Sequence, residues 1–121
     1  MRVQMSVKRF VECHKFVWQY VINELEQGTI IPVPWLKARA VKEMLESDMI
    51  DTAEYMILTL NNNCFLCVHF RRCYRCPIEN CFLENSLYSR AVNGEINAAE
   101  KIRDIVDYLL ERKEDSIFIY E

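Results

Sequence analysis

Five of the six cysteines lie between positions 64 and 81. They form two Cys-x-x-Cys units with five residues between them, and four more residues separate the second unit from a fifth cysteine. Two thiolates three residues apart can reach one cation from a single turn, and two such turns supply the four sulfurs of a tetrahedral zinc site. The spacing therefore predicts a structural zinc ion bound by Cys64, Cys67, Cys73 and Cys76, with Cys81 as an alternate ligand.

Other chemistries use the same residues. Disulfides among the cysteines would fix an irregular segment that buries little surface by itself, and an iron–sulfur cluster also takes four thiolates. A redox-active thiol pair at Cys73 and Cys76 is a further alternative, although such pairs usually belong to α/β folds. His69 lies between the two units and is a substitute ligand, ranked below the cysteines.

Arg71, Arg72 and Arg75 lie inside this block, and Phe70 and Tyr74 alternate with them. Arginines next to aromatic rings are typical of surfaces that contact phosphates and stack on bases. This pattern predicts nucleic-acid binding as an alternative function. The plainer interpretation is a solvated surface or a protein contact, because acidic residues follow closely.

Composition restricts the fold that surrounds this block. The chain has 121 residues, only two glycines and three prolines, and a net charge of −3. So few turn-forming residues argue against an all-β fold and favour long helices. The acidic balance gives the whole chain no attraction to nucleic acid, so any such affinity must come from a local patch.

The first helix is predicted over residues 3–26, with Gly28 as its stop. Charged and amide side chains lie away from its apolar face. The apolar seam and its widening residues are Val7, Phe10, His14, Val17, Val21, Val11, Trp18, Ile22 and Leu25. His14 and Cys13 could together donate to a metal, but a core histidine is the expected role.

A second helix should start at Pro34, which suits a first helical turn. Its predicted buried stripe is Trp35, Ala38, Val41 and Leu45. The run from Asp51 to Glu54 resembles a capping box that opens a third helix. The apolar face of that helix is predicted to be Ala53, Met56, Ile57 and Leu60.

Near the C-terminus, a fifth helix is predicted over residues 83–92, closed by Asn93 and Gly94. Asn97 and Glu100 suggest a cap that opens a sixth helix. The predicted apolar face of the sixth helix is Ile102, Ile105, Val106, Leu109 and Leu110. The β-prone residues 116–120 should lie as a tail on the bundle, and pairing with another chain is the alternative.

The motif Cys-x-Leu-Cys, followed by Cys-x-x-Cys-Pro and Cys81, resembles the core of a group of short helical proteins of unknown function from prokaryotic viruses and archaea. The resemblance covers residues 35–110 and includes Leu66 and Pro77. In that group the segment before the fifth cysteine is longer and contains a glycine, whereas Cys81 follows quickly here. The resemblance implies a cysteine-centred helical fold and no particular activity.

Together these observations predict an all-α, single-domain bundle of five or six helices over residues 1–121, with a cysteine-rich knuckle at 64–81 between the third and fifth helices. The beginning of the chain has no continuous apolar run, and no stretch is long enough to span a membrane. We therefore expect a cytoplasmic protein, in the host cytoplasm if the source is viral.

The expected function is a non-enzymatic binding or assembly protein with a zinc-bound or disulfide-linked knuckle. Its partner would be another protein, or a second copy of the chain through the aromatic-rich first helix. Nucleic-acid binding through the knuckle arginines is one alternative, and thiol redox chemistry is another. No catalytic motif, membrane partner or small-molecule substrate is identified.

Overall fold

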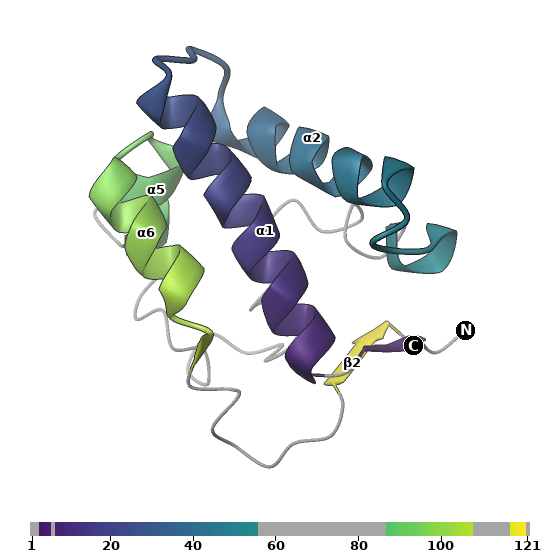
Figure 1. Ribbon diagram of the computed structural model, residues 1–121. Coiled ribbons are helices and arrows are strands. Elements are labelled where there is room, and N and C mark those ends of the chain that lie inside the picture. Colours follow the sequence, from purple (N-terminus) through teal and green to yellow (C-terminus); the bar gives the residue numbers. More distant parts are fainter. Residues whose placement is uncertain (1–2, 6, 56–86, 108–116, 121) are drawn as a thin grey trace.

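The computed structural model describes residues 3–5, 7–55, 87–107 and 117–120 (Figure 1). In this part the chain is mostly helical, as composition predicts, and residues 52–55 are helical as well. The knuckle at 64–81 and the total number of helices depend on residues outside this part and stay predictions. The elements are β1 (Val3–Met5), α1 (Val7–Glu26), α2 (Val33–Glu46), α5 (Leu87–Val92), α6 (Ile96–Asp104) and β2 (Ile117–Tyr120).

Helix α1 is the central element of the described fold. It packs against α2 on one side and α6 on another, while α5 packs on α6 and also contacts α2 (Figure 1). The predicted apolar seam of α1 is confirmed where its side chains are described, because Val11, His14, Val17 and Val21 are all buried. Most of the large side chains that form this core come from α1 and α2.

Three aromatic residues, Phe16, Trp18 and Tyr20, suggested a helix shared between subunits; Trp18 is buried within the chain itself, and the other two are partly buried against the same core. Trp18 has no exposed surface, and the outward positions of α1 are polar: Lys8, Glu12, Gln19 and Asn23 are exposed. A central position in one bundle therefore accounts for the aromatic face of this helix. Dimerisation through α1 stays a prediction, which sedimentation of the purified protein can test.

Local chemistry sets the helix ends. At the end of α1, Gly28 has φ +80° and its N–H donates to Leu25 O at 3.0 Å, while the next residue, Thr29, donates to Glu24 O at 3.0 Å. This pair of bonds is a Schellman motif, which satisfies carbonyls that a helix end leaves open. The predicted stop at Gly28 is confirmed, and Gly94 (φ +94°) ends α5 in the same way.

The predicted capping box is present in full. Glu54 N–H donates to Asp51 Oδ1 at 2.8 Å, and Asp51 N–H donates to Glu54 Oε1 at 3.0 Å.

The second predicted cap, at Asn97 and Glu100, is wrong. Helix α6 begins at Ile96, its cap position is Glu95, and no side chain caps it. The Schellman turn at Gly94 starts the next helix directly, so Asn97 falls inside the first turn.

The predicted face of α2 is also wrong in part. Trp35 is 70% exposed and Ala38 is exposed, whereas the buried residues include Leu36, Lys37 and Ala40. Of the predicted stripe, Val41 is buried and Leu45 is partly buried. The helix is rotated by about one residue, roughly 100°, so that Leu36 rather than Trp35 packs against the core. Pro34 lies in the first turn, as predicted.

The ends of the described chain pair with each other. β1 and β2 form an antiparallel ribbon with Gln4 opposite Phe118 and Met5 opposite Ile117. The first helix therefore begins at Val7 rather than at residue 3, because residues 3–5 are extended in this ribbon. The tail pairs within its own chain, which neither of the two interpretations of residues 116–120 included.

The predicted apolar residues at the C-terminal end of α6 and just after it are confirmed as far as the structure describes them. Ile102 and Val106 are fully buried and Ile105 is partly buried. Among the described residues, no helix combines the length and the apolar character needed to cross a bilayer.

Candidate functional site

The residues that the sequence singles out for chemistry lie mostly outside the described part. Cys64, Cys67, Cys73, Cys76 and Cys81 all fall there, as do His69 and the three knuckle arginines. The zinc, disulfide, iron–sulfur and redox interpretations therefore stay predictions. Within the described residues, no three histidine, cysteine or acidic side chains gather as metal ligands would.

His14 and Cys13 are core residues. His14 is fully buried, and its Nε2 donates to Ile102 O at 2.7 Å, which joins α1 to α6. Burial lowers the pKa of His14 to about 4, so the imidazole is neutral at pH 7. Burial raises the pKa of the Cys13 thiol to about 11. Both side chains therefore pack in the core, which confirms the expected core role of His14.

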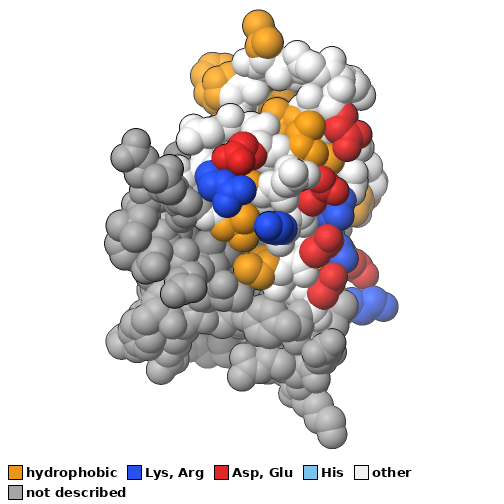
Figure 2. Space-filling view, turned by 90° about the vertical axis from the view of Figure 1, so that its left-hand side faces the viewer, with side chains coloured by type: hydrophobic (Ala, Val, Ile, Leu, Met, Phe, Trp, Pro, Cys, Tyr) orange, Lys and Arg blue, Asp and Glu red, His pale blue; other side chains and the backbone are white. Residues whose placement is uncertain are grey.

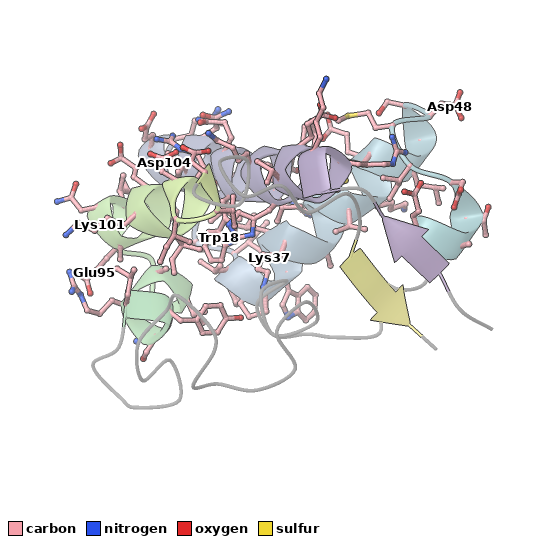
Figure 3. The ribbon with its side chains drawn as sticks, turned by 90° about the horizontal axis from the view of Figure 1, so that it is seen from below. Trp18, Lys37, Asp48, Glu95, Lys101 and Asp104 are labelled. Carbon is pink, nitrogen blue, oxygen red and sulfur yellow. The ribbon has the colours of Figure 1, made fainter. Side chains whose placement is uncertain are left out.

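A buried lysine of α2, which the sequence analysis missed, lies where α2 meets α1 and α5. Lys37 is only 6% exposed, and its Nζ lies 5.4 Å from the ring centroids of both Trp18 and Tyr88. Nζ also donates to Tyr88 Oη at 3.3 Å. Figure 3 shows Trp18 and Lys37 together at the interface of α1 and α2. Cation–π attraction to two rings stabilises a charge that burial would otherwise disfavour.

The rings around this lysine also contact each other. Trp18 and Tyr88 meet edge to face, with centroids 6.4 Å apart and an interplanar angle of 78°. Lys37 occupies a row of otherwise apolar α2 positions, which was the available signal for its burial. The cluster fixes α5 against α1 and α2, and we assign it a structural role.

Among the residues that the structure describes, a groove follows the outward side of α2. It has a volume of about 540 Å³, and six described residues line it. We call it the Trp35 groove; its lining residues are Pro34, Trp35, Ala38, Arg39, Lys42 and Tyr55. Its size falls within the range of ordinary ligand sites.

Two elements position these side chains. Residues 34–42 belong to α2, where positions three and four apart lie on one face, so Trp35, Arg39 and Lys42 form one row. Tyr55 comes from the helical turn that the capping box opens, and its N–H donates to Asp51 O at 2.9 Å. The groove is therefore formed by α2 and by the helical turn at residues 52–55. Each begins at a local sequence signal: Pro34 in the first turn of α2, and the capping box of Asp51 and Glu54 at the start of the turn.

The groove is cationic. Arg39 and Lys42 are exposed, and no acidic residue is among the six that line it. Arg39 makes no ion pair with any residue that the structure describes, and Lys42 Nζ lies 4.0 Å from Glu46 Oε1, both side chains being well exposed. Such a surface pair contributes little. Trp35 adds a large exposed aromatic surface beside these charges.

The face formed by α5 and α6 has a different charge pattern. Around α5 and α6, cations and acids alternate (Figure 2). Arg90 Nε lies 3.1 Å from Glu95 Oε2, and Arg103 Nε lies 2.8 Å from Asp104 Oδ1. Glu95, Lys101 and Asp104 lie together on this side in Figure 3. Charges on this face compensate one another, whereas those of the Trp35 groove are available to an anionic ligand.

Comparison of the chain with protein-family models, with curated proteins and with solved structures found no match. The resemblance to the viral and archaeal cysteine-cluster group stays a prediction. The Trp35 groove was also invisible to the sequence analysis, which placed Trp35 and Ala38 in the core. The signal that could have found it is the pair of cations on the same face as Trp35.

Proposed function

We propose that this protein is a non-enzymatic binding protein and that the Trp35 groove is one of its binding surfaces. The observation that carries the proposal is the exposure of Trp35, at 70%, beside an open groove with two cations. Trp and Arg are the residues most enriched at positions that dominate binding energy. Burying the indole against a partner would remove a large apolar surface from water.

The positions of Arg39 and Lys42 define the kind of partner. Arg39 and Lys42 have no acidic side chain beside them among the described lining residues, which favours an anionic ligand. The exposed indole favours a ligand that also has an apolar or planar part. The net charge of −3 makes nonspecific attraction of polyanions weak. Binding at this groove should therefore depend on the lining residues.

A fluorescence titration tests the proposal. The chain has two tryptophans, of which Trp18 is buried and Trp35 exposed, so a ligand in the groove should change the emission of Trp35. The probes are an oligothymidylate and an oligoglutamate, each at low salt. We expect a saturable change with at least one probe, and no such change in Trp35→Phe, which retains Trp18 as the background signal.

The control variant has the same charge change elsewhere. Arg39→Gln should weaken the response, whereas Lys101→Gln removes one positive charge from α6, on a different face, and should leave it unchanged. A flat titration with both probes would refute the groove as a binding surface. Equal losses of the fluorescence response in the two variants would mean that binding depends on net charge and not on the groove.

We propose further that Cys64, Cys67, Cys73 and Cys76 hold a structural zinc ion, with Cys81 as an alternate ligand and disulfides as the competing arrangement. Their spacing supports this proposal. Metal analysis of the purified protein, combined with a count of free thiols after denaturation, tests it. One zinc per chain and six thiols support the zinc site; no metal and fewer thiols support disulfides; iron supports a cluster.

A further inference from the structure

We infer that the Trp35 groove binds single-stranded nucleic acid. This inference rests on the proposed function and names the ligand class for that same groove. It assigns the contact to α2, away from the knuckle arginines that the sequence analysis singled out. Three observations carry it: the exposed indole, the cations placed along the same helix face, and the small residues Pro34 and Ala38 in the same lining.

The indole supplies a stacking surface at one end of the row. Trp35 lies in the first turn of α2 and is 70% exposed, so its ring is available to a base without any rearrangement of the core. Every base has a π-face, so stacking on an exposed aromatic ring tolerates any sequence. Tyr55 contributes a second aromatic side chain to the lining.

The cations follow at helical spacing. Arg39 is four residues after Trp35, about 6 Å further along the axis, and Lys42 is three residues later, about 4.5 Å beyond. A strand that stacks one base on Trp35 and runs along α2 would place backbone phosphates near both cations. Arginine presents several N–H donors in a planar fork, which suits a phosphate.

Small residues leave room for the planar group. Pro34 and Ala38 are the lining residues next to the indole, and neither carries a long side chain. A base can therefore approach the helix backbone beside Trp35, where Ala38 precedes the cation Arg39. An oligoglutamate would also pair with Arg39 and Lys42, but its side chains carry no apolar or planar group to place against the indole. The ring is the feature that favours nucleic acid over peptide.

The charge of the chain favours a short single strand over a duplex. The exposed acids Glu43 and Glu46 are also on α2, and the chain as a whole is negative. A rigid duplex would extend its phosphates over these acids, whereas a single strand can follow the row of cations. Two phosphate contacts predict a salt dependence with a slope of log K against log salt of about −1.4.

Fluorescence anisotropy with a labelled twelve-nucleotide oligothymidylate measures the interaction directly. We expect saturable binding at low salt, weakened about ten-fold by Trp35→Ala, since loss of one stacked base has an effect of this order. Arg39→Gln should reduce the salt slope by about 0.7, the share of one phosphate. A matching duplex should bind more weakly than the single strand.

Control variants separate the groove from the rest of the chain. Ile30→Ala removes an apolar side chain that is 97% exposed outside the lining, and Lys101→Gln removes a distant charge; both should bind as the native protein does. Circular dichroism should show that Trp35→Ala stays folded, because the indole contributes little to the core.

The outcomes distinguish this inference from the proposed function. Binding of the oligoglutamate but not of the oligothymidylate would overturn the inference and leave the groove as a binding surface for acidic peptides. If neither probe bound, both this inference and the proposed function of the groove would be overturned. Oligothymidylate binding that survives Trp35→Ala but is lost in the triple variant of Arg71, Arg72 and Arg75 to Gln would place the contact at the knuckle and overturn the inference.

Discussion

Arg9 and Glu54 form a two-point ion pair that joins the start of α1 to the helical turn at residues 52–55. Arg9 Nε donates to Glu54 Oε2 at 2.6 Å, and Nη2 donates to Glu54 Oε1 at 2.9 Å. Nη2 also donates to the carbonyl of Met49. Since Glu54 belongs to the capping box as well, one carboxylate both caps this turn and anchors it, and the turn carries Tyr55 to the Trp35 groove.

Glu54→Gln should destabilise the fold by about 1–2 kcal/mol, because charge-assisted hydrogen bonds are worth more than neutral ones and the Arg9 side chain is 40% exposed, which screens the pair. Urea denaturation measures the change. Lys15→Met removes the exposed pairs with Asp104 and Asp107 and should cost less than about 0.5 kcal/mol. Equal costs for the two variants would contradict the structural importance of Glu54.

The same pair contributes to acid sensitivity. The hydrogen bond from Arg9 lowers the pKa of Glu54 below its usual value, with the backbone N–H of Asp51 acting in the same direction. A lowered carboxyl pKa gives stability that is present above the unfolded pKa, about 4.5, and is lost as pH falls through the folded value. Glu54→Gln should therefore flatten the loss of stability below about pH 4.5.

His14 should govern stability at milder acidity. Burial lowers its pKa to about 4, so the unfolded chain, with a pKa near 6.5, takes up a proton before the folded chain does. The contribution of His14 to the free energy of unfolding is then fully present above about pH 6.5 and decreases by up to about 3 kcal/mol as the pH falls toward 4. Urea midpoints measured from pH 7 to 4 should show this decline.

His14→Gln keeps a donor for the Ile102 carbonyl but does not titrate, so its midpoints should change less between pH 6.5 and 4.5. His69→Gln is the matched variant, since the chain has only two histidines. If His69→Gln removed the pH dependence and His14→Gln did not, the assignment to His14 would be wrong.

Cys13 should be unreactive in the folded protein. Its side chain is 3% exposed and burial raises its pKa to about 11, so little thiolate is present at pH 8. The native protein and Cys13→Ala should show the same number of rapidly reacting thiols with a disulfide reagent. In guanidinium chloride they should differ by one. A difference of one under native conditions would contradict the buried position.

Asp48→Gly should stabilise the protein by about 0.5–1 kcal/mol, because Asp48 holds φ +61° at the end of α2, where glycine is unstrained. Asp48 is exposed at this helix end, so little else is lost (Figure 3).

Gly28→Ala, at the end of α1, is the reverse experiment. Nothing lies within 4 Å of the added Cβ, so its cost of about 1 kcal/mol would be backbone strain alone. Thermal unfolding measures both.

Several features follow from neighbouring residues and could be predicted from the sequence. Gly28 and Gly94 end their helices, Pro34 lies in a first turn, and Asp51 and Glu54 form the capping box. Each of these signals acts over a few residues through backbone geometry, so it is present in the sequence itself. The apolar seam of α1 was equally clear because its positions repeat over the whole helix.

Other features depend on parts of the chain that are distant in sequence. α2 has two candidate apolar faces, and contact with α1 and α5 decided that Leu36 is buried and Trp35 exposed. The burial of Lys37 depends on Tyr88, fifty-one positions away. The pairing of β1 with β2 joins the two ends of the described chain. Short-range patterns specify where a helix begins and ends, but the direction its side chains face depends on which distant surface packs against it, and in this protein that choice created the groove.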